Sequence, residues 1–354
     1  MPLVAHTNLP SFQRLREEGE EVLSLRRARH QDIRALHIGL LNMMPDKALE
    51  ATERQFFRLV GACNQISQFY VHPFTIPGLP RGAKAQAHID RYYEPFEKIR
   101  QEGLDALIIS GANVTGDQLE KEAFWQSLLE VFSWARHNVT SVLCSCLATH
   151  AIVQHLYGIR RTPLDAKRWG VFAHQVIDRR HPLTAEINTR FDVPHSRFNE
   201  IFRADLEAAG LRILVTSDVA GVHLATSPDG FRIVFFQGHP EYDDISLLKE
   251  YKREVQRFHL REIDVYPPFP DHYFNTQAQQ LLAAYQQSVI ARRAPGHALP
   301  PFPETELLPI IDITWRDTAR AVFNNWLGKI YQITHQDRNR PFMPGIDPDN
   351  PLNL

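Results

Sequence analysis

Cys146 is the residue in this sequence whose position best suits covalent chemistry. It ends the apolar run Val139 to Cys146, and the amphipathic segment Leu147 to Tyr157 begins directly after it. A nucleophile at such a strand–helix junction is exposed on a tight turn at the carboxyl edge of a sheet. The positive end of the helix favours its thiolate form. The backbone N–H of Leu147 is then expected to bind an oxyanion.

The alternative for any single cysteine is an inert core position, because free cysteine is among the most buried residue types. Cys144 lies two residues before Cys146 on the same expected strand, and we interpret it as such a core residue. With Cys63, the chain holds three cysteines, an odd and low number that argues against a disulfide framework and indicates a reducing compartment. None has zinc-ligand spacing, and we expect neither a metal centre nor a bound cofactor.

A second candidate pair, His239 and Glu241, follows the apolar run Arg232 to Gln237 in the segment FQGHPEYDD. Open α/β sheets bind their ligands at the carboxyl ends of their strands, where Cys146 is also expected. A cysteine nucleophile needs a base, and the base needs an orienting group. The alternative is that His239 caps the next helix and Glu241 is solvated. Taken together, the two segments favour a Cys–His–Glu triad.

The scaffold that must position these residues alternates short apolar runs with amphipathic segments. Expected strands lie at 36–43, 67–76, 106–110, 139–146, 170–177, 212–217, 222–225 and 232–237. Expected helices lie at 47–61, 89–103, 122–137, 147–157, 245–258, 277–292 and 315–333. This alternation predicts an α/β fold with a mainly parallel sheet flanked by helices. We interpret 1–354 as one domain, with its core at about 33–262 and 312–335 and a Pro-rich excursion at 264–309.

The composition excludes several classes of function. The net charge is −2, so no global field attracts a nucleic acid or an anionic membrane. The N-terminus has no apolar signal segment, and no apolar run reaches the roughly 20 residues that a membrane span needs. We therefore expect a cytoplasmic protein that acts on small molecules. The sequence leaves the oligomeric state open, a homodimer included.

Several motifs, in order, give the chain a resemblance to the homoserine O-acyltransferases, the family of homoserine O-succinyltransferase and its acetyl-using relatives. They cover roughly 33–262 and 312–335, and they read LNMMPDK, ISGANVTG, VTSVLCSCLATHA, DAKRWGVFAH, VPHSRFNE, FQGHPEYDD, YKREV and WRDTARAVFNNWLGKIYQIT. The resemblance implies a flavodoxin-like fold similar to that of class I glutamine amidotransferases. It also implies ping-pong transfer of an acyl group from acyl-CoA to L-homoserine, in methionine biosynthesis.

The resemblance also assigns roles to single residues. Cys146 matches the nucleophile that carries the acyl group as a thioester, His239 the proton acceptor, and Glu241 the residue that orients it. An oxyanion site at the backbone of Leu147 and Gly111 fits this scheme. Three further positions match substrate-binding residues, of which the arginine holds the carboxylate of the amino acid; they are Lys167, Ser196 and Arg253.

The sequence departs from the family pattern around the substrates. Leu147 and Ala148 follow the nucleophile, where Trp and then Gly or Ala are usual. The position that separates acetyl users (Glu) from succinyl users (Gly) is Thr115. Thr is neutral and shorter than Glu, which favours succinyl-CoA over acetyl-CoA. Three alternatives stay open: acylation of another hydroxy amino acid such as L-serine, a glutaminase that shares the triad, and a non-catalytic binding protein on the same fold.

Overall fold

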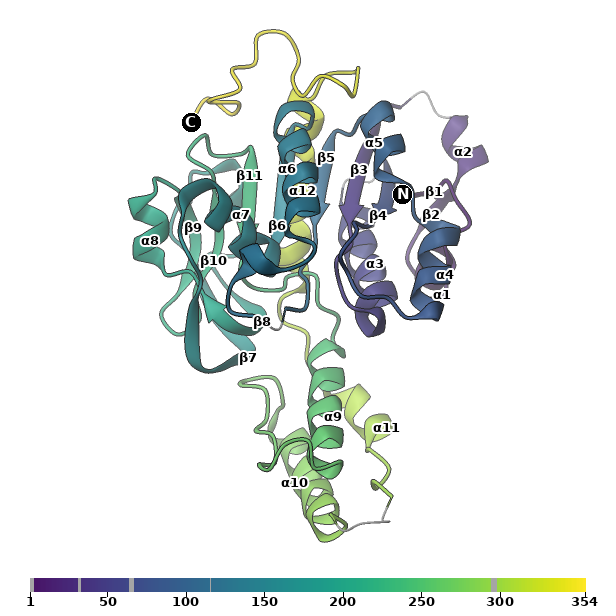
Figure 1. The fold of residues 1–354 in the computed structure, drawn as a ribbon, viewed down its shortest axis with the longest axis vertical. Coiled ribbons are helices and arrows are strands. Elements are labelled where there is room, and N and C mark those ends of the chain that lie inside the picture. Colours follow the sequence, from purple (N-terminus) through teal and green to yellow (C-terminus); the bar gives the residue numbers. More distant parts are fainter. Residues whose placement is uncertain (1–2, 31–32, 64–66, 115, 294–297) are drawn as a thin grey trace.

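The computed structural model describes residues 3–30, 33–63, 67–114, 116–293 and 298–354. Over these residues the strands form one sheet of eleven, in the order β2-β1-β4-β3-β5-β6-β11-β10-β9-β7-β8 (Figure 1). The strands are β1 (Leu3–Ala5), β2 (Val22–Ser24), β3 (Ala35–Leu41), β4 (Gln68–Phe74), β5 (Ala106–Ile109), β6 (Ser141–Ser145), β7 (Thr162–Val176), β8 (Arg190–Glu200), β9 (Arg212–Ser217), β10 (Gly221–Thr226) and β11 (Ile233–Phe236).

The sheet is parallel from β2 to β11 and antiparallel from β11 to β8. The helices are α1 (Pro10–Glu17), α2 (Leu25–Arg29), α3 (Asp46–Gly61), α4 (Ala83–Tyr92), α5 (Phe96–Glu102), α6 (Trp125–Asn138), α7 (Leu147–Tyr157), α8 (Arg203–Ala208), α9 (Ser246–His259), α10 (Thr276–Ala291), α11 (Glu304–Leu307) and α12 (Arg316–Ile333). The predicted class, a mainly parallel sheet flanked by helices, is confirmed.

Each face of the sheet has its own hydrophobic core. The core on one face joins the sheet to α1, α3 and α12, and the core on the other joins it to α5, α6 and α7. The central strands are apolar toward both faces, as parallel strands covered on both sides are expected to be. β5, β6 and β11 are parallel, so their carboxyl ends lie at the same edge of the sheet. The loops that begin at this edge carry the candidate site.

Three expectations about the elements were wrong. The helix expected over 89–103 is two helices, α4 and α5, because Pro95 lacks the N–H that a helix interior needs and begins a new helix instead. No strand was expected over 190–200, where β8 forms the edge of the sheet and pairs with a β7 that is longer than expected. No strand was expected before residue 36, yet β1 and β2 extend the sheet at its other edge.

The segment that contains the Pro-rich excursion forms a lobe that projects from the sheet (Figure 1). Its α10 and α11 pack with α9 in a separate hydrophobic cluster, which also takes in Trp169 and Val171 of β7. Since the cluster includes residues from the sheet as well as from the lobe, the number of domains stays a prediction. Among the described residues, no helix is long and apolar enough to cross a membrane.

Candidate active site

Cys146 lies in the single-residue turn between β6 and α7. Its φ of +53° is one that non-glycine residues rarely adopt, and such strain is held where the surrounding structure fixes it. The Cys146 N–H donates to the carbonyl of Phe236 on β11 at 2.8 Å. The hydroxyl of Thr149 donates to the same carbonyl at 2.8 Å and to that of Cys144 at 2.9 Å. These bonds hold the thiol at the N-terminus of α7, as predicted from the sequence.

His239 and Glu241 meet Cys146 from the end of β11. The His239 N–H donates to the carbonyl of Pro194 at 2.8 Å, and its Nδ1 lies 2.8 Å from Oε1 of Glu241. The imidazole also lies close enough to Cys146 for the charges of the two groups to interact. The hydroxyl of Ser145 donates to Oε1 of Glu241 at 3.3 Å, which further fixes the carboxylate. The three side chains predicted as a triad therefore lie together, with His239 and Glu241 buried and Cys146 half-buried.

The electrostatics around His239 favour a protonated imidazole. Burial alone lowers the pKa of His239, but Cys146 and Glu241 outweigh burial and raise that pKa well above its usual value. An imidazolium beside the sulfur stabilises the thiolate, which is the nucleophilic form of cysteine. Cys144 is different: it is fully buried, and burial raises the pKa of its thiol far above the usual range. Its position in the core agrees with our interpretation of the sequence.

Gly111 lies just after β5 and faces the turn between β6 and α7 that holds Cys146. A Cβ built on Gly111 would lie 3.6 Å from Cβ of Cys146 and 3.9 Å from the backbone nitrogen of Leu147. This close approach places Gly111 beside Cys146 and the first N–H of α7. The geometry is compatible with an oxyanion site between the two residues, although that role stays a prediction.

A network that centres on Glu250 of α9 lies next to the triad. Oε2 of Glu250 lies 2.8 Å from Nζ of Lys167 and accepts from the hydroxyl of Ser196 at 2.6 Å. Oε1 accepts from the hydroxyl of Tyr242 at 2.9 Å. Burial alone raises the pKa of Glu250, but these donors, led by Lys167, bring it below the usual value. The structure thus joins Lys167 and Ser196 through a carboxylate that we had not identified.

The sequence did hold one signal for Glu250. It lies three residues before Arg253, so an α-helix over this segment puts both residues on one face. Tyr242 had no such signal, because its role depends on contact in space. Its ring stacks on His239 with centroids 4.3 Å apart, while its hydroxyl reaches Glu250. Tyr242 therefore connects the triad to the Glu250 network.

One large cleft contains all of these groups. Its volume is about 1810 Å³, and among the described residues that line it are Gly111, Cys146, Leu147, Lys167, Ser196, His239, Glu241, Glu250 and Arg253. Arg253 is 53% exposed and has its Nε 3.2 Å from Glu254, so it lies at the open side of the cleft and away from the triad. Thr115 lies outside the described residues.

Arg161 is a third residue that sequence reasoning missed. It lines the cleft, and its guanidinium donates to the carbonyl of Gly116 at 2.8 Å, in the loop that contains Thr115. Its charge is also close enough to interact with Cys146. Burial is the main reason why the pKa of Arg161 is lowered, but the group stays a cation at neutral pH. The cleft thus holds a half-buried positive charge near the nucleophile.

Fold and site together define an α/β protein with a cysteine at a strand–helix turn beside a histidine and a glutamate. The homoserine O-succinyltransferase family model matches residues 2–336. The homoserine O-succinyltransferases of Methylobacter tundripaludum and Methylococcus capsulatus are 70% and 68% identical to this chain, over 100% of both chains in each case. The chain belongs to the homoserine O-succinyltransferase family, and it is accordingly an acyltransferase enzyme, as the resemblance implied.

Solved structures of two glutamine amidotransferases also resemble this chain, at 12% sequence identity. The protein from Thermotoga maritima has a TM-score of 0.41 and covers 85% of this chain and 99% of its own. The protein from Methylobacillus flagellatus has a TM-score of 0.42 and covers 84% and 95%. At this similarity the comparison carries no argument about activity.

Proposed function

We propose that this enzyme transfers a succinyl group from succinyl-CoA to the side-chain hydroxyl of L-homoserine, in methionine biosynthesis, through a thioester on Cys146. Membership of the homoserine O-succinyltransferase family supports the overall reaction. The observation that carries the mechanism is the position of Cys146 at the wall of the cleft, beside the buried and hydrogen-bonded pair of His239 and Glu241. The cytoplasmic location and a homodimer stay predictions.

In the first half-reaction the Cys146 thiolate attacks the thioester carbonyl of the acyl-CoA. The carbonyl oxygen becomes an oxyanion, which the backbone N–H groups at Leu147 and Gly111 stabilise. Collapse of this intermediate breaks the bond to CoA, whose thiolate takes the proton of the His239 imidazolium. The products are free CoA and a Cys146 acyl-thioester, and His239 is left neutral.

In the second half-reaction neutral His239 is the base. It takes the proton of the homoserine hydroxyl as the oxygen attacks the acyl-thioester, and Glu241 stabilises the imidazolium that forms. The sulfur leaves as thiolate, so the ester is released and the starting ion pair is restored. Each half-reaction thus passes one proton through His239, and no redox step is needed.

The cleft also offers groups for the amino acid. Arg253 presents a guanidinium that fits the homoserine carboxylate with two hydrogen bonds. Lys167 and Ser196 complete the substrate wall, and Glu250 holds both of them in place. Glu250 is a positioning residue in this scheme, since its oxygens are occupied by Lys167, Ser196 and Tyr242.

Arg161 favours succinyl-CoA as the donor. A succinyl group carries a second carboxylate, and a half-buried guanidinium near Cys146 is suited to bind it. An acetyl group gains nothing from that charge. Arg161→Gln is therefore expected to lower kcat/KM for succinyl-CoA by at least tenfold and to leave that for acetyl-CoA within about twofold, as loss of one charged hydrogen bond of roughly 1.5–3 kcal/mol implies. Equal losses would show that Arg161 supports the loop instead.

The experiment that tests the whole proposal uses intact-protein mass spectrometry. The enzyme is incubated with succinyl-CoA or acetyl-CoA, and then with homoserine, serine or glutamine. We expect one succinyl adduct per chain, cleared fastest by homoserine. No adduct with either acyl-CoA would overturn the acyl-enzyme mechanism, and faster clearance by serine would overturn the acceptor. Hydrolysis of glutamine would revive the glutaminase alternative.

A further inference from the structure

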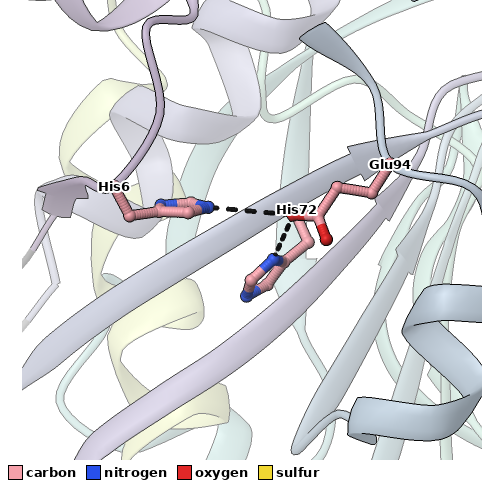
Figure 2. Close-up of side chains that lie close together, drawn as sticks. All are labelled: His6, His72 and Glu94. Carbon is pink, nitrogen blue, oxygen red and sulfur yellow. Dashed lines mark hydrogen bonds and ion pairs between the residues drawn. The ribbon is translucent and has the colours of Figure 1, made fainter.

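His6, His72 and Glu94 form a compact cluster on the parallel half of the sheet, shown in Figure 2. His72 lies on β4, His6 directly follows β1, and Glu94 lies in the connection between α4 and α5. Nδ1 of His72 is 2.6 Å from Oε1 of Glu94, and Nε2 of His6 is 4.0 Å from the same oxygen. None of the three lines the substrate cleft. The cluster is therefore separate from the candidate active site.

The hydrogen bonds of His6 leave a lone pair that faces this cluster. Its Nδ1 lies 3.2 Å from the carbonyl of Val4, and since a carbonyl can only accept, Nδ1 carries the ring proton. Nε2 of the neutral ring is then an acceptor, buried and without a hydrogen-bond partner among the described residues. Its nearest charged neighbour is an oxygen of Glu94, which is also an acceptor. A cation between the two atoms would satisfy both.

A third histidine, His37, contacts the ring nitrogen of His72 that does not face Glu94. Nε2 of His72 lies 2.9 Å from Nδ1 of His37, whose backbone N–H donates to Asp105 at 2.7 Å. Metal-bound histidines generally donate the N–H of their other ring nitrogen to such a partner, which fixes the tautomer. When Nδ1 of His72 binds a metal, Nε2–H donates to Nδ1 of His37. Both rings then change tautomer and no net proton is lost.

One charge opposes a cation here. Nζ of Lys98 lies 2.9 Å from Oε2 of Glu94. Lys98 is 52% exposed and also lies 3.8 Å from Glu102, so its ammonium is able to turn toward that exposed carboxylate. Removal of the Lys98 charge should therefore strengthen cation binding. Removal of a ligand should weaken it, so the two kinds of variant test the hypothesis through opposite effects.

We propose that His6, His72 and Glu94 bind one Zn²⁺ ion, with water as a fourth ligand. Two imidazoles and a carboxylate are ligands that Zn²⁺ accepts, and the filled d shell of this ion imposes little geometry. The three ligand atoms all lie within 4.8 Å of one another. A tetrahedral site separates them by about 3.4 Å, so side-chain movements of roughly 1 Å complete it. Sequence analysis predicted no metal centre, because these residues are far apart in the chain.

The ion would fasten the N-terminal strands to the sheet. β1 pairs with β4 through a single residue pair, Leu3 with Phe69, whereas β3 pairs with β4 through seven. Coordination by His6, His72 and Glu94 ties the end of β1 to β4 and to the α4–α5 connection. The site is thus structural, and bound Zn²⁺ is expected to raise the temperature of unfolding.

The test is calorimetric titration of chelator-treated enzyme with zinc chloride, in the Cys146→Ala background so that the active-site thiol does not compete. We expect one Zn²⁺ per chain and a higher unfolding temperature. His6→Ala and Glu94→Gln should weaken binding by more than about 100-fold, beyond the cost of losing an outer partner. Lys98→Gln should tighten it. His88→Ala is the matched control, since His88 pairs with Glu53 at 2.8 Å outside the cluster.

Absence of Zn²⁺ binding would overturn the proposal, and the cluster would then be a hydrogen-bonded network only. Binding that His6→Ala and Glu94→Gln leave unchanged would also overturn it, because the ion would then lie elsewhere. Circular dichroism shows whether each variant folds. If His6→Ala does not fold, Glu94→Gln and Lys98→Gln decide the question through their opposite expected effects.

Discussion

Nδ1 of His239 lies 2.8 Å from Oε1 of Glu241, two residues further along the chain. A separation of two residues places base and orienting group on one short loop after β11, so a single segment determines their geometry. Only Cys146 comes from a different strand end. The alignment of the triad therefore depends on how β6 and β11 pair, and these strands are hydrogen-bonded neighbours.

Glu241→Gln tests the ion pair directly. Loss of the carboxylate removes one of the two charges that raise the pKa of His239, so that pKa should fall. We expect kcat to drop by about 10²–10⁴-fold, the range of general-base help. The measurements are steady-state rates and ultraviolet thiolate absorbance against pH. Near-normal kcat would reduce the triad to a Cys–His dyad.

Cys146→Ala and Cys144→Ala form a matched pair two residues apart. Cys146→Ala should abolish both turnover and the acyl adduct, because no nucleophile remains. Cys144→Ala should keep most of the activity, since Cys144 is fully buried and its thiol stays protonated. Intact mass after exposure to succinyl-CoA, followed by peptide mapping, distinguishes them. An acyl group found on Cys144 would contradict the assignment.

Arg253→Lys tests recognition of the amino acid carboxylate. A lysine ammonium keeps the charge but not the two-pronged geometry, so KM for homoserine should rise by about tenfold or more while KM for succinyl-CoA changes little. Arg257 lies on the same helix, also lines the cleft and also pairs with Glu254, so Arg257→Lys serves as the control. Equal increases in KM for both substrates would indicate that Arg253 supports the fold.

Thr115→Glu tests the acyl-donor position that departs from the family pattern. A glutamate there adds bulk and a charge that repels the succinyl carboxylate, so preference should shift from succinyl-CoA toward acetyl-CoA. The preceding loop residues Gly111 to Val114 line the cleft. Competition between the two donors, read as the ratio of kcat/KM values, measures the shift. An unchanged ratio would mean that another residue limits the acyl pocket.

Much of the fold was predictable because buried parallel strands appear in the sequence as short apolar runs, such as Ala106–Ile109. Edge strands lack that signal. β8 mixes buried, half-buried and exposed residues and includes Pro194, while β1 and β2 are three residues long. These strands form through pairing with distant neighbours, which no local pattern of residues expresses.

The residues of the candidate site also fall into two groups, those that the sequence predicted and those that it did not. Cys146 and His239 follow strand ends, and their positions in the sequence alone suggested that they meet. Glu250 and Arg161 lie on a helix and in a connection, where a charged residue is ordinarily solvated. Only the packing of α9 against β7 and β8 places Glu250 between Lys167, Ser196 and Tyr242. The family resemblance supplied Lys167 and Ser196 but no reason for their pairing.

The lobe determines the order in which the enzyme loses its separate activities when it is heated or mutated. α9 packs in the lobe's own hydrophobic cluster, whereas Cys146 and His239 are held by the cores of the sheet, so the two walls of the cleft belong to different packing units. Local opening of the lobe carries Glu250 and Arg253 away and leaves the nucleophile intact. Damage to the lobe therefore appears first as lost affinity for the amino acid, under conditions in which the enzyme is still able to become acylated.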